Sequence, residues 1–262
     1  MSEWGIENPE ALQFDEGITL VAIELVGGNL HVTASAGPSS LVIREVRGPQ
    51  LRVKLEEGRL EIWQRPPAFW GAGSALVSAS VSLSVPLGCR TRIETVSASV
   101  VVEGLDAELS LRTVSGEATL ESVRGPVTAA TVSGAVASRG QTGKFRVETA
   151  SGGVTLDAFG GRSARLQSVS GEVVADLKQA EPDSSIEIQT VSGAVFLRLP
   201  VSPSQKVRVD SISGRLTSAF PELRPENRPG SRSLRGSLGA AQGKVRISTI
   251  SGAVSLLAGV PA

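Results

Sequence analysis

A four-residue motif, Thr-Val-Ser-Gly or a close variant, recurs through most of the chain and constrains its fold more than any other feature. A degenerate first copy ends at Ala98, and the next three intervals, to positions 116, 134 and 152, are all 18 residues. Such regular short spacing predicts that each copy is one structural unit stacked on the previous one, as in a solenoid. The complete copies end at Gly116, Gly134, Gly152, Gly171, Gly193, Gly214 and Gly252.

Apolar residues alternate on both sides of the motif, which predicts a β-strand before it and another after it. The alternation slips by one residue inside the motif, and this slip predicts a corner or bulge that glycine permits. The position five residues before the motif end is apolar in all eight copies: Ile93, Leu111, Ala129, Val147, Leu166, Ile188, Val209 and Ile247. So is the position two residues after it: Val100, Ala118, Val136, Val154, Val173, Val195, Leu216 and Val254.

Further glycines between the copies, at Gly104, Gly125, Gly143 and Gly160-Gly161, predict a second corner, so that two short strands and two turns make one rung. Aromatic residues make up only 3% of the chain and tyrosine is absent, which suits thin β layers with small interior side chains. We therefore expect an all-β, single-domain, right-handed parallel β-helix with rungs of about 18–22 residues, the hand following the usual crossover preference.

The regular pattern does not extend over the whole chain. Residues 1–90 carry it loosely and predict irregular N-terminal rungs, interrupted by an aromatic loop at residues 63–71. Residues 91–262 form the regular Ser-Gly repeat, interrupted at residues 221–243, where prolines and arginines predict an excursion loop. Both parts are expected to form one continuous domain.

These features resemble a bacterial β-strand-repeat domain of unknown function that is often labelled "putative adhesin". The resemblance is carried by the Val85-Pro86 step into the regular array, the Ser-Gly repeat, the long segment before a final Ile-Ser-Thr-Ile-Ser-Gly copy and the end of the chain soon after it. It implies a β-solenoid and supplies no catalytic residues. Some relatives resemble cell-envelope stress proteins, which implies a connection with the envelope.

Residues with catalytic or ligating chemistry are few. Lys and Arg number 26 and Asp and Glu number 26, so no bulk charge favours nucleic acid or an anionic membrane. His31 is the single histidine, which excludes a multi-histidine metal site, and Cys89 has no partner cysteine and is expected to be a buried thiol. Serines lack a Gly-x-Ser-x-Gly elbow, and the acids do not fall at one repeat position: Asp106, Asp157, Asp176 and Asp210. We expect no enzyme activity, no cofactor and no metal.

Two segments are candidate interaction surfaces. Trp63, Phe69 and Trp70 could form an exposed anchor or a plug over the end of the solenoid, and the plug is favoured because solenoid ends need covering. The arginines of residues 221–243 could bind an acidic partner, although a solvated loop is the simpler interpretation. They are Arg224, Arg228, Arg232 and Arg235.

The sequence thus favours a non-catalytic structural or interaction scaffold that binds an unknown protein partner or self-associates through its ends. The alternative is a carbohydrate-binding or carbohydrate-active β-helix protein. The first residues carry no apolar leader and no stretch reaches about 18 consecutive apolar residues, so we expect a cytoplasmic protein without direct membrane insertion, with envelope association only through a partner.

Overall fold

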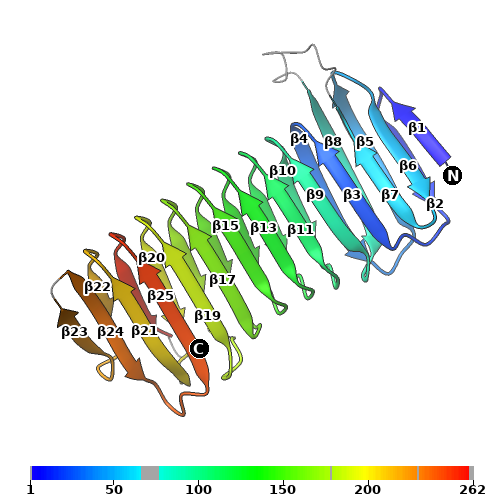
Figure 1. Ribbon diagram of the computed structural model, residues 1–262. Coiled ribbons are helices and arrows are strands. Elements are labelled where there is room, and N and C mark those ends of the chain that lie inside the picture. The colour runs from blue at the N-terminus through cyan, green and yellow to red at the C-terminus, as the bar shows by residue number, and fades with distance from the viewer. Residues whose placement is uncertain (1, 66–76, 178, 229, 260–262) are drawn as a thin grey trace. The chain divides into compact units, whose positions relative to one another are not determined.

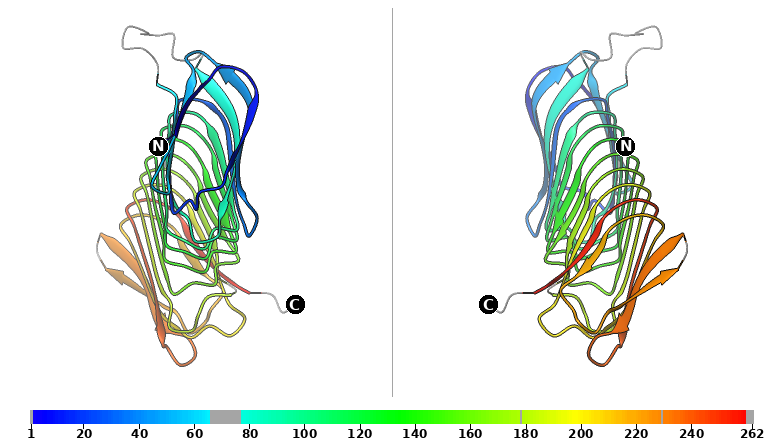
Figure 2. Two further views of the ribbon diagram at one scale, coloured as in Figure 1. Left: turned by 90° about the vertical axis from the view of Figure 1, so that its right-hand side faces the viewer. Right: turned by 90° about the vertical axis from the view of Figure 1, so that its left-hand side faces the viewer.

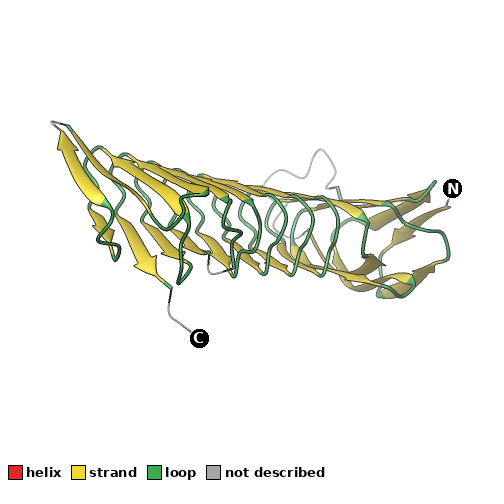
Figure 3. Cartoon of the chain, turned by 90° about the horizontal axis from the view of Figure 1, so that it is seen from below, coloured by secondary structure: helices red, strands yellow, loops and turns green. Residues whose placement is uncertain are grey.

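The structure is a computed structural model that describes residues 2–65, 77–177, 179–228 and 230–259. All regular secondary structure in these ranges is β-strand, and Figure 3 shows the strands in two layers joined by loops. Contacts group the chain into two compact parts, unit 1 (Met1–Ala135) and unit 2 (Val136–Ala262), which are described separately. In each unit we call sheet A the sheet of the strands that precede the motif, and sheet B the sheet of the strands that follow it.

Unit 1 places its strands in two sheets that combine regular rungs with N-terminal additions (Figure 1). Sheet A has the order β1 (Ser2–Ile6), β6 (Leu51–Glu56), β7 (Arg59–Trp63), β3 (Leu20–Leu25), β9 (Arg90–Thr95), β11 (Leu109–Thr113) and β13 (Val127–Thr131). Sheet B has the order β2 (Glu10–Phe14), β5 (Ser39–Arg47), β8 (Ser78–Pro86), β4 (Gly28–Ser35), β10 (Ser99–Glu103) and β12 (Ala118–Glu121).

Unit 2 has the same two-sheet plan. Its sheet A has the order β15 (Phe145–Thr149), β17 (Ser163–Ser168), β19 (Ser185–Thr190), β25 (Gly243–Thr249), β21 (Gln205–Ser211), β24 (Ser231–Ser237) and β23 (Arg224–Arg228). Its sheet B has the order β14 (Val136–Arg139), β16 (Val154–Asp157), β18 (Val173–Asp176), β20 (Val195–Leu199), β26 (Val254–Ala258) and β22 (Leu216–Ser218). The final rung, β25 and β26, is therefore inserted between earlier strands and does not lie at an edge of either sheet.

The regular copies pair in parallel and in register, as the 18-residue interval predicts. Leu109 of β11 faces Val127 of β13, and the motif threonines Thr113 and Thr131 face one another in the same ladder. Inward positions of successive copies consequently stack in columns. The apolar columns predicted from the sequence are buried, apart from the half-buried Leu216, and Phe145 joins them at 2% exposure.

The first ninety residues differ from a stack of parallel rungs. Strand pairs β1–β6, β6–β7, β2–β5 and β5–β8 are antiparallel, whereas β3 and β4 pair in parallel with their neighbours. The β6–β7 connection explains one of these pairs, because Glu57 and Gly58 both adopt positive φ (50° and 74°). Two successive residues of this kind make the tight hairpin turn that matches strand twist. Residues 1–90 were predicted to form irregular rungs of a parallel β-helix, and these four antiparallel pairs depart from the parallel arrangement.

The motif forms the corner between sheet A and sheet B, and each of its residues has a distinct position. Its hydroxyl residue is buried, and in most copies the oxygen accepts the N–H of the glycine, as from Gly134 to Thr131 Oγ1 at 2.9 Å. The next residue, valine or isoleucine in most copies, is 40–56% exposed, which is the slip in alternation seen in the sequence. Local hydrogen bonds of this type stabilise a turn without a special backbone conformation.

The motif glycines are required by close stacking and not by backbone conformation. None of them has a positive φ, contrary to the expectation that conformational freedom selects glycine here. A Cβ built on Gly134 would collide with the carbonyl oxygen of Gly116, and one on Gly193 would collide with that of Gly171. These successive corners therefore pack backbone against backbone, and a side chain at Gly134 or Gly193 would force them apart.

Trp4 and Phe14 join the two sheets of unit 1 at their edge strands. Trp4 lies on β1 and Phe14 on β2, and their rings meet edge to face with centroids 6.0 Å apart. Phe14 and Ile6 are buried at 5% and 2% exposure, so this contact covers the end of the core. The predicted plug was placed instead at Trp63 to Trp70, and residues 66–70 of that segment lie outside the described residues.

The predicted excursion loop at residues 221–243 is largely strand. β23 and β24 form an antiparallel pair, and β24 also pairs antiparallel with β21, so the segment extends sheet A of unit 2 (orange and brown in Figure 2). Leu223, Leu234 and Leu238 are buried, which gives this extension its own apolar contacts. The prolines do not prevent it because Pro225 lies on the edge strand β23, where a missing N–H is tolerated.

Candidate binding site

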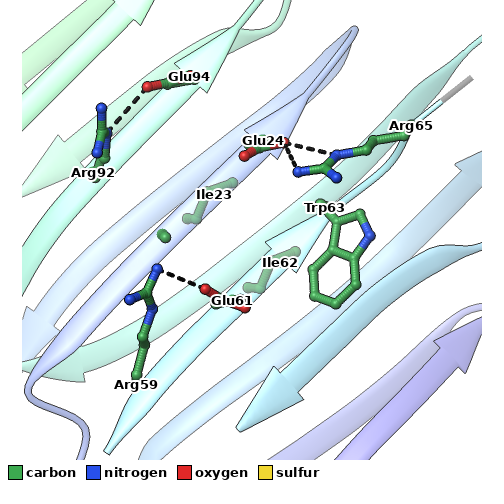
Figure 4. Close-up of a pocket in the computed structure, with 10 residues that line it drawn as sticks. Ile23, Glu24, Arg59, Glu61, Ile62, Trp63, Arg65, Arg92 and Glu94 are labelled. Carbon is green, nitrogen blue, oxygen red and sulfur yellow. Dashed lines mark hydrogen bonds and ion pairs between the residues drawn. The ribbon is translucent and has the colours of Figure 1, made fainter. Parts of the chain in front are cut away.

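A hollow of about 420 Å³ opens on the outer face of sheet A in unit 1, where β7, β3 and β9 run side by side (Figure 4). Ala22 lies at its centre, paired in register with Glu61 on β7 and with Arg92 on β9. The small side chain of Ala22 between two long ones leaves the hollow. We call this the neutral groove, and its charged members are Glu24, Arg59, Glu61, Arg65, Arg92 and Glu94.

Each carboxylate in the neutral groove is bound by an arginine (Figure 4). Arg59 Nη2 lies 2.7 Å from Glu61 Oε1, and Arg92 Nε lies 3.1 Å from Glu94 Oε1.

The third pair joins β3 to the residues that follow β7. Arg65 donates from Nε and Nη2 to Glu24 Oε2 at 3.0 and 2.8 Å. With three arginines and three glutamates, the groove is charge-balanced, and each of these side chains has an oppositely charged partner. Each of the three carboxylates of the groove has a cationic partner, so none of them is free to act as a general acid or base.

Trp63 forms one wall of the neutral groove. It is the last residue of β7 and half-buried, and it pairs in register with Glu24, so it belongs to the sheet and not to a loop. The prediction of a loop starting at residue 63 is wrong at this residue. Phe69 and Trp70 lie outside the described residues.

The other sequence candidates are dispersed. Arg224 lies on β23, and Arg232 and Arg235 lie on β24, while the side chain of Arg228 lies outside the described part of the chain. Arg235 Nη2 lies 3.3 Å from Asp210 Oδ1 on β21, which ties the predicted arginine segment to the regular sheet.

Apart from Trp63, the residues of the neutral groove were not identified from the sequence. Their signal was present, because Ala22, Glu24, Arg92 and Glu94 occupy the outward positions of strands whose inward positions were identified. What the sequence did not reveal is that β7, from a separate segment, lies beside β3. That pairing brings Trp63 and Glu61 to the other two strands.

His31 and Cys89 have the structural roles that were expected of them. The His31 side chain is 45% exposed, with Nε2 3.3 Å from Glu103 Oε1. Cys89 is fully buried, and this burial raises the pKa of its thiol to about 11, which leaves it neutral and unreactive near pH 7. Within the described ranges, no group of three or more His, Cys, Asp or Glu residues is arranged to hold a metal ion.

The comparisons with known proteins agree with the fold and with the predicted resemblance. The model of the family described as Toastrack DUF4097 matches residues 106–257, more than half of the chain. The chain belongs to this family. The predicted resemblance to a β-strand-repeat domain of unknown function is thereby confirmed. No curated protein matches the sequence.

Among solved structures, the Toastrack chain is similar to a "putative adhesin" from Bacteroides fragilis at 9% identity, covering 96% of this chain and 98% of that one, with a TM-score of 0.51. A "putative cell adhesion protein" from Clostridium sporogenes is 11% identical, with coverage of 96% and 100% and a TM-score of 0.31. A "putative lipid binding protein" from Parabacteroides distasonis is 13% identical, with coverage of 98% of both chains and a TM-score of 0.44. At these identities the Bacteroides structure supports the fold alone.

The described residues contain no helix whose length and apolar character would carry it across a bilayer.

Proposed function

We propose that this protein is a non-catalytic interaction scaffold of the adhesin-like type, which binds a partner through the outer face of sheet A in unit 1. The observation that carries this proposal is the full pairing of the neutral groove, where Glu24, Glu61 and Glu94 each accept from an arginine. A charge-balanced set of arginines and glutamates on a sheet offers a ligand both hydrogen-bond donors and hydrogen-bond acceptors. A catalytic carboxylate needs freedom to exchange a proton, which these pairs restrict.

A second candidate is carbohydrate binding, and the position of Trp63 favours it. An indole offers a large flat apolar surface, and here it stands beside the Arg65–Glu24 pair. The apolar face of a sugar ring could lie against the indole while its hydroxyl groups bind the neighbouring charged side chains. The groove's lack of excess charge suits a neutral sugar better than an acidic one.

Both candidates are tested by measuring the binding of neutral oligosaccharides and of a protein partner to two variants. Trp63→Ala removes the wall of the neutral groove, and Phe196→Ala removes an exposed aromatic side chain on β20 in unit 2. We expect binding to neutral oligosaccharides, or to a protein partner, to fall at least tenfold in Trp63→Ala and to be unchanged in Phe196→Ala.

Mass spectrometry of the recovered ligand tests the non-catalytic part of the proposal. The ligand is expected to be unchanged after prolonged incubation, and turnover would contradict the proposal. Binding that is equal in both variants would also contradict it, because the neutral groove would then take no part.

Self-association, location and handedness complete the proposal. In unit 2 the edge strands are protected, since β23 contains Pro225 and β22 has only three residues. We therefore assign self-association to the edge strands β1 and β2 of unit 1. Light scattering of a Glu10→Pro variant tests this, and we expect a lower mass than for the native chain at high concentration.

We also propose that the strands wind in a right-handed sense and that the protein is cytoplasmic, with envelope association through a partner. Cell fractionation tests the location directly.

A further inference from the structure

A second hollow lies on the outer face of sheet A in unit 2 and differs in charge from the neutral groove. Its volume is about 540 Å³, and it is formed by β25, β21 and β24. We call it the cationic groove. Its positive charge comes from five side chains: Lys206, Arg208, Arg235, Lys244 and Arg246.

Sheet register sets these cations directly opposite one another. Lys206 on β21 pairs with Lys244 on β25, and Arg208 pairs with Arg246 on one side and with Arg235 on the other. Neighbouring strands are about 4.8 Å apart, and successive outward residues on one strand are about 6.6 Å apart. The four charges on β21 and β25 therefore form a grid. Like charges at directly opposed positions repel and destabilise a sheet.

Few carboxylates neutralise this grid. Asp210 Oδ2 lies 2.6 Å from Arg208 Nε, and the other Asp210 oxygen accepts from Arg235. Burial raises the pKa of Asp210, but the hydrogen bonds and charges of the two arginines outweigh burial and hold it below its usual value. The carboxylate is thus ionised and already occupied.

The remaining cations of the groove have no such partner. In the described part of the chain, the side chains of Lys206, Lys244 and Arg246 form no ion pair or hydrogen bond. Glu187 stands opposite Arg246 in the ladder, but its Oε2 lies 2.6 Å from Arg165 Nη2. Because the whole chain has no net charge, this excess of positive charge is a local feature.

Arg235 supplies an independent observation at the same place. Its Nε is buried and has no hydrogen-bond acceptor, although its two terminal nitrogens pair with Asp210 and Glu226. Buried donors in folded proteins normally have an acceptor, and an orphaned one calls for a reason. A bound oxyanion is a chemically suitable acceptor, since guanidinium groups bind such ions through two parallel hydrogen bonds.

From this geometry we propose that the cationic groove binds a ligand with two or more adjacent oxyanion groups, laid across β21 and β25. A single small anion would contact only part of the grid, whereas a chain of phosphate, sulfate or carboxylate groups can neutralise both opposed pairs at once. The two sources of this chemistry are a phosphate chain and an acidic glycan. The lysines and arginines of β21 and β25 are exposed on the open face of a sheet. Such a surface suits an extended ligand better than a small molecule, which needs an enclosed pocket.

The test measures binding of inorganic tripolyphosphate by calorimetry. The Lys244→Gln, Arg246→Gln double variant removes one side of the grid, and the control double variant Arg90→Gln, Arg124→Gln removes two exposed cations of unit 1. We expect at least tenfold weaker binding and a shallower dependence on salt in the first, and less than a twofold change in the control. Circular dichroism and thermal unfolding confirm that both variants are folded.

A second arm uses orthophosphate and an oligogalacturonate, which separate the possible sources. Orthophosphate is expected to bind at least tenfold more weakly than the better of the two polyanions, and the tighter polyanion identifies the class of ligand. Absence of millimolar binding by both polyanions, or equal loss in the control variant, would overturn the proposal. Trp63→Ala should leave this binding unchanged, so failure here is separate from failure of the neutral groove.

Discussion

Units 1 and 2 have the same type of corner and the same type of apolar core, but the charges on the outer face of sheet A differ between them. In the neutral groove of unit 1, Arg92 is held by Glu94 on its own strand. In the cationic groove of unit 2, Arg246 faces Arg208 and has no carboxylate partner in the described residues. The inward residues that define the fold are similar in both units, so the outward residues are free to differ. A repeated scaffold can therefore carry two surfaces of unlike chemistry.

The largest expected effect tests the shared corner. Gly116→Ala in unit 1 and Gly193→Ala in unit 2 each place a Cβ against a backbone carbonyl of the preceding corner, which cannot move without displacing a strand. We expect each to lower the free energy of unfolding by about 3 kcal/mol or more. Urea denaturation measures this loss.

Gly88→Ala is the control for that comparison, because a Cβ at Gly88 meets nothing within 4 Å. It should change stability by less than about 1 kcal/mol. If the two corner variants were as stable as this control, close stacking would not be the reason for glycine in the motif.

A smaller change in stability is expected when the threonine is replaced in two copies of the corner within unit 1. Thr113 Oγ1 accepts the Gly116 N–H at 3.0 Å, whereas Thr95 Oγ1, in the degenerate copy, is buried without a hydrogen-bond partner. Thr113→Val should cost about 1–3 kcal/mol because it leaves a buried N–H unpaired. Thr95→Val should be neutral or stabilising in the same denaturation experiment. Equal losses would contradict the role assigned to the threonine hydroxyl.

Charge on sheet A gives a smaller difference of opposite sign in the two units. Glu94→Gln in unit 1 removes the partner of Arg92 and should lower stability by roughly 0.5 kcal/mol. Lys244→Gln in unit 2 relieves its repulsion with Lys206 and should raise stability by a similar amount. Thermal unfolding in low salt and in 1 M salt measures both, and both effects should shrink in high salt. Effects of the same sign would break the comparison.

The smallest effect concerns the pH dependence of Asp210. Its pKa in the folded protein is held below the usual value of 3.8, so the folded state favours the ionised form. This contribution to stability is present above pH 3.8 and is lost as the pH falls through the lower folded pKa. Asp210→Asn should therefore be less stable than the native chain near pH 6, and the difference should shrink towards pH 2. A difference that is constant with pH would show that ionisation of Asp210 is not involved.

The sequence alone determined the repeating architecture, because a strand buried on one face must alternate and a stacked corner must repeat. The 18-residue interval and the columns at Leu111 and Val136 were readable in this way. These features depend on contacts between positions at a constant separation. Local patterns record such contacts directly.

Only the tertiary structure decided which strands are neighbours outside the regular array. It placed β7 beside β3, inserted β25 between β19 and β21, and added β24 to the sheet where a loop was predicted. Those pairings join segments at irregular separations, and no period in the sequence encodes them. Both grooves depend on them, because Trp63 reaches Glu24, and Arg208 reaches Arg246, only through strand pairing. The physical reason is that outward side chains do not determine sheet order, which is set by burial of the inward ones.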